Sequence, residues 1–189
     1  MEKKRKTIAV LALQGAFAEH ERMIAEAGYD WFEVRQLSDW QREKDGLVIP
    51  GGESTTLSKL LTDLRLMEPV RDAIVDGLPV LGTCAGLILL TKNLEGGPEK
   101  RLATMDISVR RNAYGRQLGS FHTVSEVKGL GQVPMTFIRA PYIERVGPDV
   151  EVLSRVDGHI VAAREGRQVV TAFHPELDDY TGIYPFVFE

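Results

Sequence analysis

The stretch VLGTCAGLILL (residues 80–90) decides the fold, because it predicts a buried strand, a tight turn and a helix in quick succession. The run PVLGTC is apolar on both faces, as a strand inside a parallel sheet should be, and a helix begins over residues 85–91. Gly82 and Gly86 flank the turn, where a Cβ atom on either side would clash with neighbouring backbone. The turn carries Cys84, the single cysteine of the chain. Cys84 is therefore either a small buried apolar residue or a nucleophile raised on a nucleophile elbow.

Strands and helices alternate through the first half of the chain. Strands are expected at residues 7–13, 31–34, 46–50 and 79–84, and helices at 16–27, 53–67, 68–76 and from 85 onward. Ser54 or Thr55 is the expected cap of the second helix. This alternation predicts βαβ units around a parallel sheet.

The second half of the chain is mainly β. Strand-like segments occur at residues 103–111, 121–129, 134–141, 150–158, 159–166 and 168–175, and VDGH (156–159) is a good hairpin turn. We expect antiparallel pieces added to the same sheet, and one α/β domain over residues 1–189, because no linker or repeat interrupts the chain.

Composition excludes several classes of function. The chain has 189 residues, 43% of them hydrophobic, and a formal net charge of -4, so neither a nucleic-acid surface nor a membrane surface is expected. One cysteine cannot form an internal disulfide, which favours a reducing compartment and a cytoplasmic protein. The start, MEKKRKTIAVLAL, imitates a secretory signal. Its apolar run is short and Gln14–Gly15 follow it, so a buried first strand is the better interpretation.

His174 is the candidate base for a cysteine nucleophile. The stretch TAFHPE places His174 and Glu176 two residues apart at the end of an apolar strand, where both side chains of an extended chain project to one side. Glu176 can then hold the imidazole in one tautomer. The competing interpretation is a solvated His-Pro turn. His122 and His159 lack such an acidic neighbour, and His20 is interpreted as a surface or structural residue.

A third motif, PGGEST (50–55), lies between a strand and a helix. Its two glycines leave backbone N–H groups free for an anionic oxygen, although an ordinary βα loop has the same composition. The chain has neither a G-x-x-x-x-G-K-[ST] phosphate loop nor a G-x-S-x-G serine elbow.

PGGEST, GTCAG and FHPE, in this order, resemble the motifs of a class I glutamine amidotransferase domain. Three further stretches, LQGAFAEH (13–20), RNAYGRQLGSF (111–121) and FIRAP (137–141), are similar to the glutaminase subunit of pyridoxal 5'-phosphate synthase, the PdxT/SNO family. The resemblance covers nearly the whole chain. It implies a three-layer, flavodoxin-like fold with a mostly parallel central sheet.

The resemblance also implies the site. Cys84 attacks the side-chain amide of L-glutamine, His174 moves the proton to the leaving ammonia, and Glu176 orients His174. The N–H groups of Gly52 and Ala85 form the oxyanion hole. The implied glutamine-binding residues are Gly52, Glu53, Ser54, Arg111, Ile138 and Arg139. No cofactor and no metal are implied.

The implied partner is a separate synthase subunit, which uses the ammonia to build pyridoxal 5'-phosphate from ribose 5-phosphate and glyceraldehyde 3-phosphate. Alternatives are a glutaminase for another acceptor, such as imidazole glycerol phosphate synthase, a cysteine peptidase or chaperone-like relative, and a binding subunit with a vestigial triad. The ending DDYTGIYPFVFE departs from the family's amphipathic C-terminal helix. Gly182 and Pro185 predict a last helix that is short, broken or absent.

Overall fold

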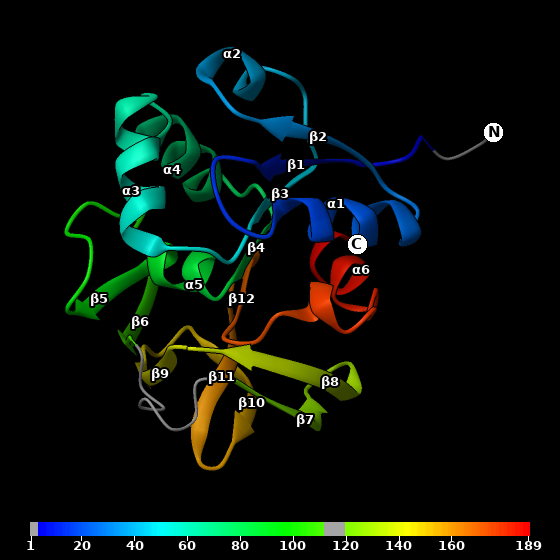
Figure 1. Cartoon of the computed structure of the whole chain (residues 1–189), viewed down its shortest axis with the longest axis vertical. Coiled ribbons are helices and arrows are strands. Elements are labelled where there is room, and N and C mark those ends of the chain that lie inside the picture. Colours follow the sequence, from blue (N-terminus) through cyan, green and yellow to red (C-terminus); the bar gives the residue numbers. More distant parts are fainter. Residues whose placement is uncertain (1–3, 112–119) are drawn as a thin grey trace.

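The computed structural model describes residues 4–111 and 120–189. The central sheet has ten strands, shown in Figure 1. They are β1 (Thr7–Leu11), β2 (Asp30–Val34), β3 (Gly46–Ile49), β4 (Val80–Thr83), β5 (Thr91–Glu95), β6 (Met105–Arg110), β9 (Tyr142–Val146), β10 (Glu151–Val156), β11 (His159–Glu165) and β12 (Gln168–Thr171). Nine of them follow the order β2-β1-β3-β4-β12-β11-β9-β6-β5, and β10 pairs with β11 outside this path.

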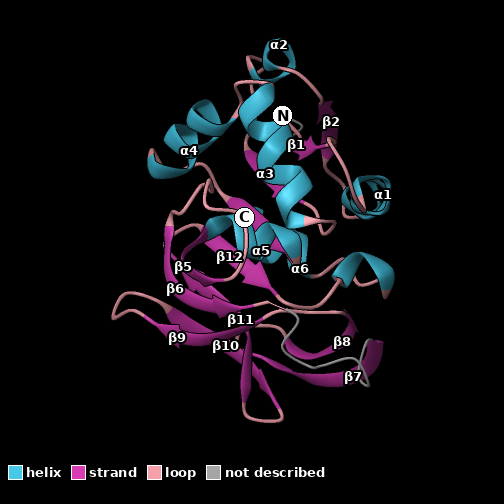
Figure 2. Cartoon of the chain, turned by 60° about the vertical axis from the view of Figure 1, so that its left-hand side comes forward, coloured by secondary structure: helices cyan, strands magenta, loops and turns pink. Residues whose placement is uncertain are grey.

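The helices cover both faces of the sheet. They are α1 (Phe17–Glu26), α2 (Leu37–Trp40), α3 (Ser54–Asp63), α4 (Met67–Val75), α5 (Ala85–Leu90) and α6 (Ile183–Phe188), with a 3₁₀ helix, η2 (Pro175–Leu177). Figure 2 shows α1 on one side of strands β1 and β2 and α4 on the other. Strand β2 lies on one side of β1, and β3 and β4 lie on the other side. Because each crossover between parallel strands is right-handed, the helices of the two directions lie on opposite faces of the sheet. Within the described ranges, no helix has the length and apolarity needed to cross a bilayer.

The parallel strands form the middle of the core. Strand β1 pairs in parallel with β2 and β3, and β4 pairs in parallel with β3 and β12. Every residue of β3 and β4 is buried, which explains why these segments are apolar on both faces. The N-terminal apolar run is therefore a central strand. The predicted α/β fold with a mostly parallel sheet and antiparallel additions is confirmed.

The second half corrects part of the prediction. Strands β7 (Ser120–Val127) and β8 (Gly131–Ile138) form a separate two-stranded sheet instead of joining the central one. One face of β8 packs on the core through Val133, Met135 and Phe137, so this hairpin covers the sheet rather than extending it. The hairpin turn at 156–159 is confirmed, because Val156 pairs with His159 across it.

Three short elements were missed in the sequence. Helix α5 ends at Leu90, and β5 follows it directly, with mostly exposed polar residues that give no apolar run. Strand β9 has a single fully buried position, Ile143, and α2 is only four residues long. Such short strands and single helical turns carry too few apolar residues for a periodic signal.

The C-terminal segment forms a short helix, which is one of the three outcomes that the sequence left open. Pro185 stands in the first turn of the six-residue helix α6, where a backbone N–H has no partner within the helix. Tyr184 and Phe188 are buried in the core, and Phe188 fills the space beside Gly46. The aromatic end of the chain thus packs on the core.

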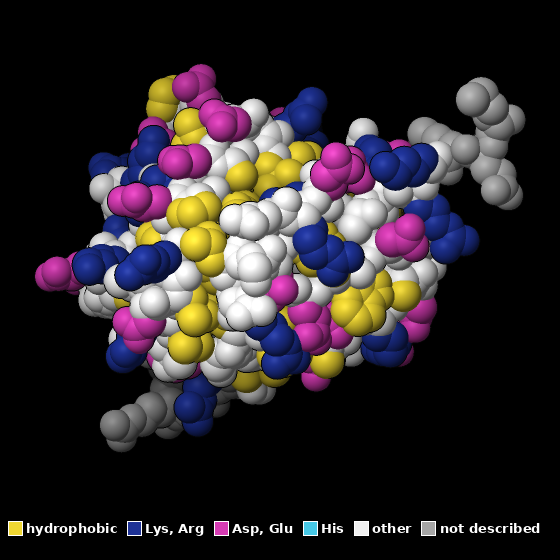
Figure 3. Space-filling model, turned by 90° about the horizontal axis from the view of Figure 1, so that it is seen from above, with side chains coloured by type: hydrophobic (Ala, Val, Ile, Leu, Met, Phe, Trp, Pro, Cys, Tyr) yellow, Lys and Arg dark blue, Asp and Glu magenta, His cyan; other side chains and the backbone are white. Residues whose placement is uncertain are grey.

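Figure 3 shows acidic and basic side chains interspersed over the face seen from above.

Candidate active site

Cys84 lies on a strained turn between β4 and α5. Its backbone has φ 51° and ψ -99°, a conformation that L residues rarely adopt. The Cys84 N–H donates to the carbonyl oxygen of Thr171 on β12 at 2.8 Å, which ties the turn to the neighbouring strand. A Cβ atom at Gly86 would lie 2.2 Å from the carbonyl oxygen of Ile49, and one at Gly82 would lie 2.9 Å from the carbonyl carbon of Gly86. The turn therefore has the geometry of a nucleophile elbow.

His174 follows β12 and is held by two hydrogen bonds. Its backbone N–H donates to the carbonyl oxygen of Thr136 on β8 at 2.9 Å, and its ring Nδ1 lies 2.6 Å from Oε1 of Glu176. The pair forms as predicted, but the predicted reason was wrong. Residues 175–177 form a 3₁₀ helix rather than extended chain, with Pro175 at its first position, and this turn brings Glu176 back to the imidazole.

Electrostatics favour a charged His174. Burial alone would lower the pKa of His174, but hydrogen bonds to Cys84 and Glu176 and the charge of Glu176 raise it to about 10. Burial would raise the pKa of Glu176, but His20 and His174 lower it below its ordinary value. Glu176 is therefore a buried carboxylate that stabilises the imidazolium form of His174.

An open cavity of about 430 Å³ adjoins the elbow. All the predicted site residues except Glu176 line it: Gly52, Glu53, Ser54, Cys84, Ala85, Arg111, Ile138, Arg139 and His174. Glu176 is fully buried behind His174. The predicted residues, which are spread over the chain from 52 to 176, thus meet in one place.

The Gly51–Gly52 loop is held by the segment after β1. The Gly51 carbonyl accepts a hydrogen bond from Ala16 N–H at 2.9 Å, and Glu53 N–H donates to Oε1 of Gln14 at 2.8 Å. A Cβ atom at Gly15 would lie 1.9 Å from the Gly51 oxygen, so only glycine fits there. Gln14 was not predicted as a site residue, because nothing local in the sequence links it to a loop 39 residues away.

Glu53 is the cap of α3, in place of the predicted Ser54 or Thr55. Its carboxylate accepts from the N–H groups of Thr55 at 3.1 Å and Thr56 at 2.6 Å. Ser54 is already the first residue of the helix, and the longer Glu53 side chain reaches both free N–H groups. Nη2 of Arg111 lies 3.6 Å from Oε1 of Glu53.

Arg111 and Arg139, one arginine from each of the two specific motifs, both line the cavity. Arg110, the residue just before the first motif, pairs instead with Glu144 at 2.9 Å and does not line it. Arg139 has φ 44°, at the end of β8. Residues 112–119 of the RNAYGRQLGSF motif lie outside the described residues, and its last two residues begin β7.

The profile of the SNO glutamine amidotransferase family matches residues 10–188 of the chain. The chain belongs to this family. Among its curated relatives, pyridoxal 5'-phosphate synthase subunit PdxT of Streptococcus pneumoniae (strain CGSP14) is 54% identical over 185 residues, covering 96% of this chain and 95% of the relative. PdxT of Methanocorpusculum labreanum is 57% identical over 182 residues, with 96% of each chain covered.

Solved structures of glutamine amidotransferases resemble this chain. A crystal structure of a glutamine amidotransferase has a TM-score of 0.91 and 41% identity, covering 95% of this chain and 96% of that one. A glutamine amidotransferase from Thermotoga maritima has a TM-score of 0.64 at 13% identity, covering 98% of this chain and 84% of that one, and so shares the fold.

The other histidines of this SNO family member do not line the cavity. His122 lies 3.3 Å from Asp178, and His159 stacks on Tyr142. His20 is fully buried on α1, so the surface interpretation was wrong and the structural one holds. Its partners are distant in sequence, which is why the sequence offered no sign of them.

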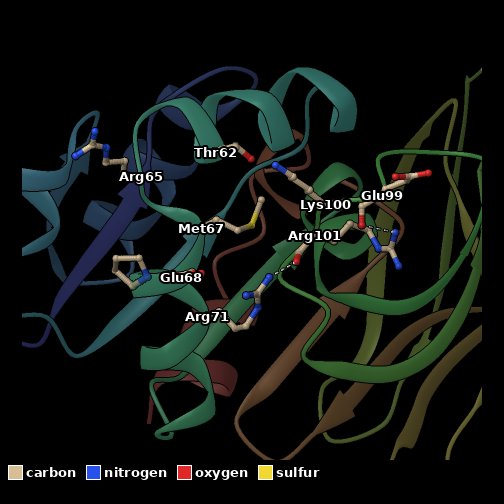
Figure 4. Close-up of a pocket in the computed structure, with 9 residues that line it drawn as sticks. Thr62, Arg65, Met67, Glu68, Arg71, Glu99, Lys100 and Arg101 are labelled. Atoms are coloured by element: carbon tan, nitrogen blue, oxygen red, sulfur yellow. Dashed lines mark hydrogen bonds between the residues drawn. The ribbon is translucent and has the colours of Figure 1, made fainter.

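A second hollow, of about 680 Å³, lies between α3, α4 and residues 99–101 and is shown in Figure 4. Two of the arginines that line it, Arg71 and Arg101, bind backbone carbonyl oxygens. Arg71 donates to the carbonyl oxygens of Leu102 at 2.9 Å and Arg101 at 2.6 Å, and Arg101 donates to Thr91 at 3.0 Å. These bonds hold the segment before β6 against α4. The elbow cavity, with its cysteine and histidine, is the better candidate for the active site of this SNO family member.

Proposed function

We propose that this chain is the glutaminase subunit of pyridoxal 5'-phosphate synthase. It hydrolyses L-glutamine to L-glutamate and ammonia, and the ammonia passes to a separate synthase subunit. The observation that carries the proposal is the pairing of Cys84, on its strained turn, with a buried His174 that Glu176 holds at 2.6 Å. The 54–57% identity to chains named PdxT supports the assignment to this synthase.

In the proposed mechanism, the sulfur of Cys84 attacks the side-chain amide carbon of glutamine. The C–S bond forms, and the carbonyl electron pair moves onto oxygen. His174 then donates its proton to the amide nitrogen, and the C–N bond breaks to release ammonia. His174 takes a proton from water, the hydroxide adds to the acyl carbon of the γ-glutamyl thioester, and the C–S bond breaks to give the product acid, glutamate. The proton on His174 then returns to the sulfur, which restores the thiol. Glu176 stays ionised throughout and keeps His174 in place.

The N–H groups of Gly52 and Ala85 are the proposed oxyanion donors. Ala85 is the first residue of α5, where a helix leaves its N–H groups without partners in the helix. The Gly51 carbonyl is bound to Ala16, and in a trans peptide the Gly52 N–H then points to the opposite side. Each such donor is typically worth about 3 kcal/mol in the transition state.

Charged groups around the cavity suit the amino-acid end of glutamine. Arg111 and Arg139 supply guanidinium groups for the carboxylate, and Glu53 supplies a carboxylate for the ammonium group. Ser54 and Ile138 complete the proposed glutamine site.

The test is glutamate release from L-glutamine, measured with and without the synthase subunit. We expect release to rise when the synthase subunit is present, and to vanish in Cys84→Ala. Ser58→Ala, a buried serine on α3 away from the cavity, is the matched control and should retain release. Unchanged release in Cys84→Ala would refute the mechanism. Release that the synthase subunit does not alter would refute the partner but leave a glutaminase.

A further inference from the structure

His20 lies directly behind the proposed catalytic residues. It comes from the middle of α1, and its side chain is fully buried. Its Nε2 lies 3.5 Å from Oε2 of Glu176 and 3.1 Å from Oγ1 of Thr83, the last residue of β4. Its Nδ1 lies 2.8 Å from the hydroxyl of Tyr184 on α6. His20 therefore links the C-terminal helix α6 to the carboxylate of Glu176.

That oxygen has a particular need for a partner. Oε1 of Glu176 is occupied by His174, whereas Oε2 is buried and makes no hydrogen bond to any described residue. A buried carboxylate oxygen without a partner is costly. The last torsion of a carboxylate side chain is intrinsically broad, so the bond at Oε1 alone leaves the position of Oε2 weakly defined. The imidazole of His20 is the polar ring that faces Oε2, so it can restrict this torsion.

The protonation of His20 follows from its surroundings. Burial lowers its pKa, Glu176 and Glu19 oppose this, and His174 adds to it, so the imidazole is neutral with a single N–H. Burial raises the pKa of Tyr184, which keeps its hydroxyl proton available for donation.

Two tautomers are then possible. If Tyr184 donates to Nδ1, the proton of His20 is on Nε2 and faces Thr83 and the Glu176 carboxylate. In the other tautomer a nitrogen lone pair would face the carboxylate, which is repulsive. The favourable tautomer is therefore the one that Tyr184 selects.

We propose that His20 is a positioning residue: its Nε2–H lies 3.1 Å from Oγ1 of Thr83 and 3.5 Å from Oε2 of Glu176, where it restrains the carboxylate electrostatically, and Tyr184 holds His20 in that tautomer. The proposal rests on the proposed glutaminase function and extends it to two residues that do not touch the cavity. It gives the short helix α6 a role in the reaction: through Tyr184 it keeps Glu176 aligned on His174.

The test compares His20→Leu, His20→Gln and Tyr184→Phe in the glutaminase assay with the synthase subunit present. Outer partners of this kind typically contribute about 10- to 100-fold. We expect His20→Leu to lower kcat by about this factor with little change in KM, and His20→Gln, which keeps a donor near the position of Nε2, to restore most of it. Tyr184→Phe should lower kcat by a smaller factor. The basic limb of the pH profile should move to lower pH in His20→Leu, because a poorly held Glu176 stabilises the His174 imidazolium less.

Tyr29→Phe is the matched control. It removes a tyrosine hydrogen bond of 2.9 Å to Glu189, at the other end of the C-terminal segment, without touching the triad. Wild-type kcat and pH profile in a folded His20→Leu would overturn the proposal, as would equal losses in Tyr184→Phe and Tyr29→Phe. If His20→Leu does not fold, Tyr184→Phe with the wild-type pH profile and kcat would overturn it. Cys84→Ala runs in parallel: retained hydrolysis there refutes the glutaminase mechanism, whatever the His20 variants do.

Discussion

Nδ1 of His174 lies 2.6 Å from Oε1 of Glu176, and the two side chains are almost completely buried. A buried carboxylate at this distance both orients the imidazole and stabilises its charged form. Glu176→Gln keeps the shape but removes the charge. We expect kcat for glutamine to fall by about 10²- to 10⁴-fold, the range of general acid–base catalysis.

The control for this variant is Asp178→Asn, which removes a negative charge two residues further along. Asp178 accepts a hydrogen bond from Thr136 at 2.8 Å, and an asparagine oxygen can still do so. Asp178→Asn should therefore keep kcat near the wild-type value. Equal losses in the two variants would mean that net charge, and not the contact with His174, matters.

The second prediction concerns protonation of His174. Its pKa is about 10 in the folded protein, because the Cys84 and Glu176 interactions outweigh the lowering by burial. Cys84→Ala removes one of these interactions, so its pKa should fall, and Glu176→Gln should lower it too. NMR of the imidazole across pH 6 to 10 measures this directly. A wild-type His174 that titrates at its ordinary value of 6.5 would contradict the prediction.

The same shift predicts how stability depends on pH. The folded pKa of His174 lies above the ordinary value, so its contribution is complete below pH 6.5 and is lost as the pH rises toward 10. The free energy of unfolding should therefore fall over this window, and fall less steeply in Glu176→Gln. Urea unfolding at several pH values measures the slope.

The third prediction concerns Gly86. Alanine normally stabilises a helix by about 1 kcal/mol relative to glycine, but here its Cβ would lie 2.2 Å from the Ile49 oxygen. Gly86→Ala should instead destabilise the protein by about 1–3 kcal/mol and slow the alkylation of Cys84 by iodoacetamide. Gly28→Ala is the control, since Gly28 has φ 91° and open space around it. It should lower stability without altering Cys84 alkylation.

The fold was largely predictable because its central strands are buried on both faces. The apolar runs that become β1, β3 and β4 needed no tertiary information, since each one alone is long and apolar enough to indicate a buried strand. The two-stranded sheet of β7 and β8 was not predictable as a separate sheet. Its alternating pattern fits either an edge of the central sheet or a hairpin packed over it, and only the tertiary fold selects between them.

The candidate site was predictable where its residues lie in local motifs. Cys84 stands between two glycines, and His174 and Glu176 are two positions apart. The contacts of Gln14 and His20 were not predicted, because they join segments far apart in the sequence: His20 and Tyr184 are 164 positions apart. Hydrogen bonds of this range leave no periodic trace in a single sequence.

The fourth prediction separates two roles of Glu53. Its carboxylate caps α3 and also lines the cavity. Glu53→Ala should lower the free energy of unfolding by about 1 kcal/mol, the usual cost of a lost cap. Burial would raise the pKa of Glu53, but its bonds to Thr56 and Thr55 lower it below 4.5, so the cap contributes above that pH and is lost as the pH falls. The stability difference between wild type and Glu53→Ala should therefore shrink in acid.

The control for Glu53 is Glu68→Ala in the first turn of α4, where the glutamate is not a cap. A smaller, salt-dependent loss is expected there, because only the helix dipole is involved. Equal losses of stability in Glu53→Ala and Glu68→Ala would show that capping is not the main role of Glu53. A raised KM for glutamine in Glu53→Ala would then assign its main role to substrate binding.

The last prediction concerns Glu21 on α1. Burial and a hydrogen bond with Glu33 raise the pKa of Glu21 to about 7, and its Oε1 is buried with no hydrogen bond to a described residue. Between pH 4.5 and 7 the folded protein keeps this proton while the unfolded chain releases it, so the free energy of unfolding falls as the pH rises through this window. Glu21→Gln mimics the protonated form and removes the effect. It should stabilise the protein at pH 8 by about 1 kcal/mol. This expected gain is smaller than the pKa shift multiplied by about 1.4 kcal/mol per unit, because solvent near the side chain screens the interaction. Glu19→Gln, at an exposed position on the same helix, is the control and should change the free energy of unfolding little. If Glu21→Gln loses the same stability at pH 5 and at pH 8, the ionised carboxylate of Glu21 is well stabilised in the fold and the prediction is wrong.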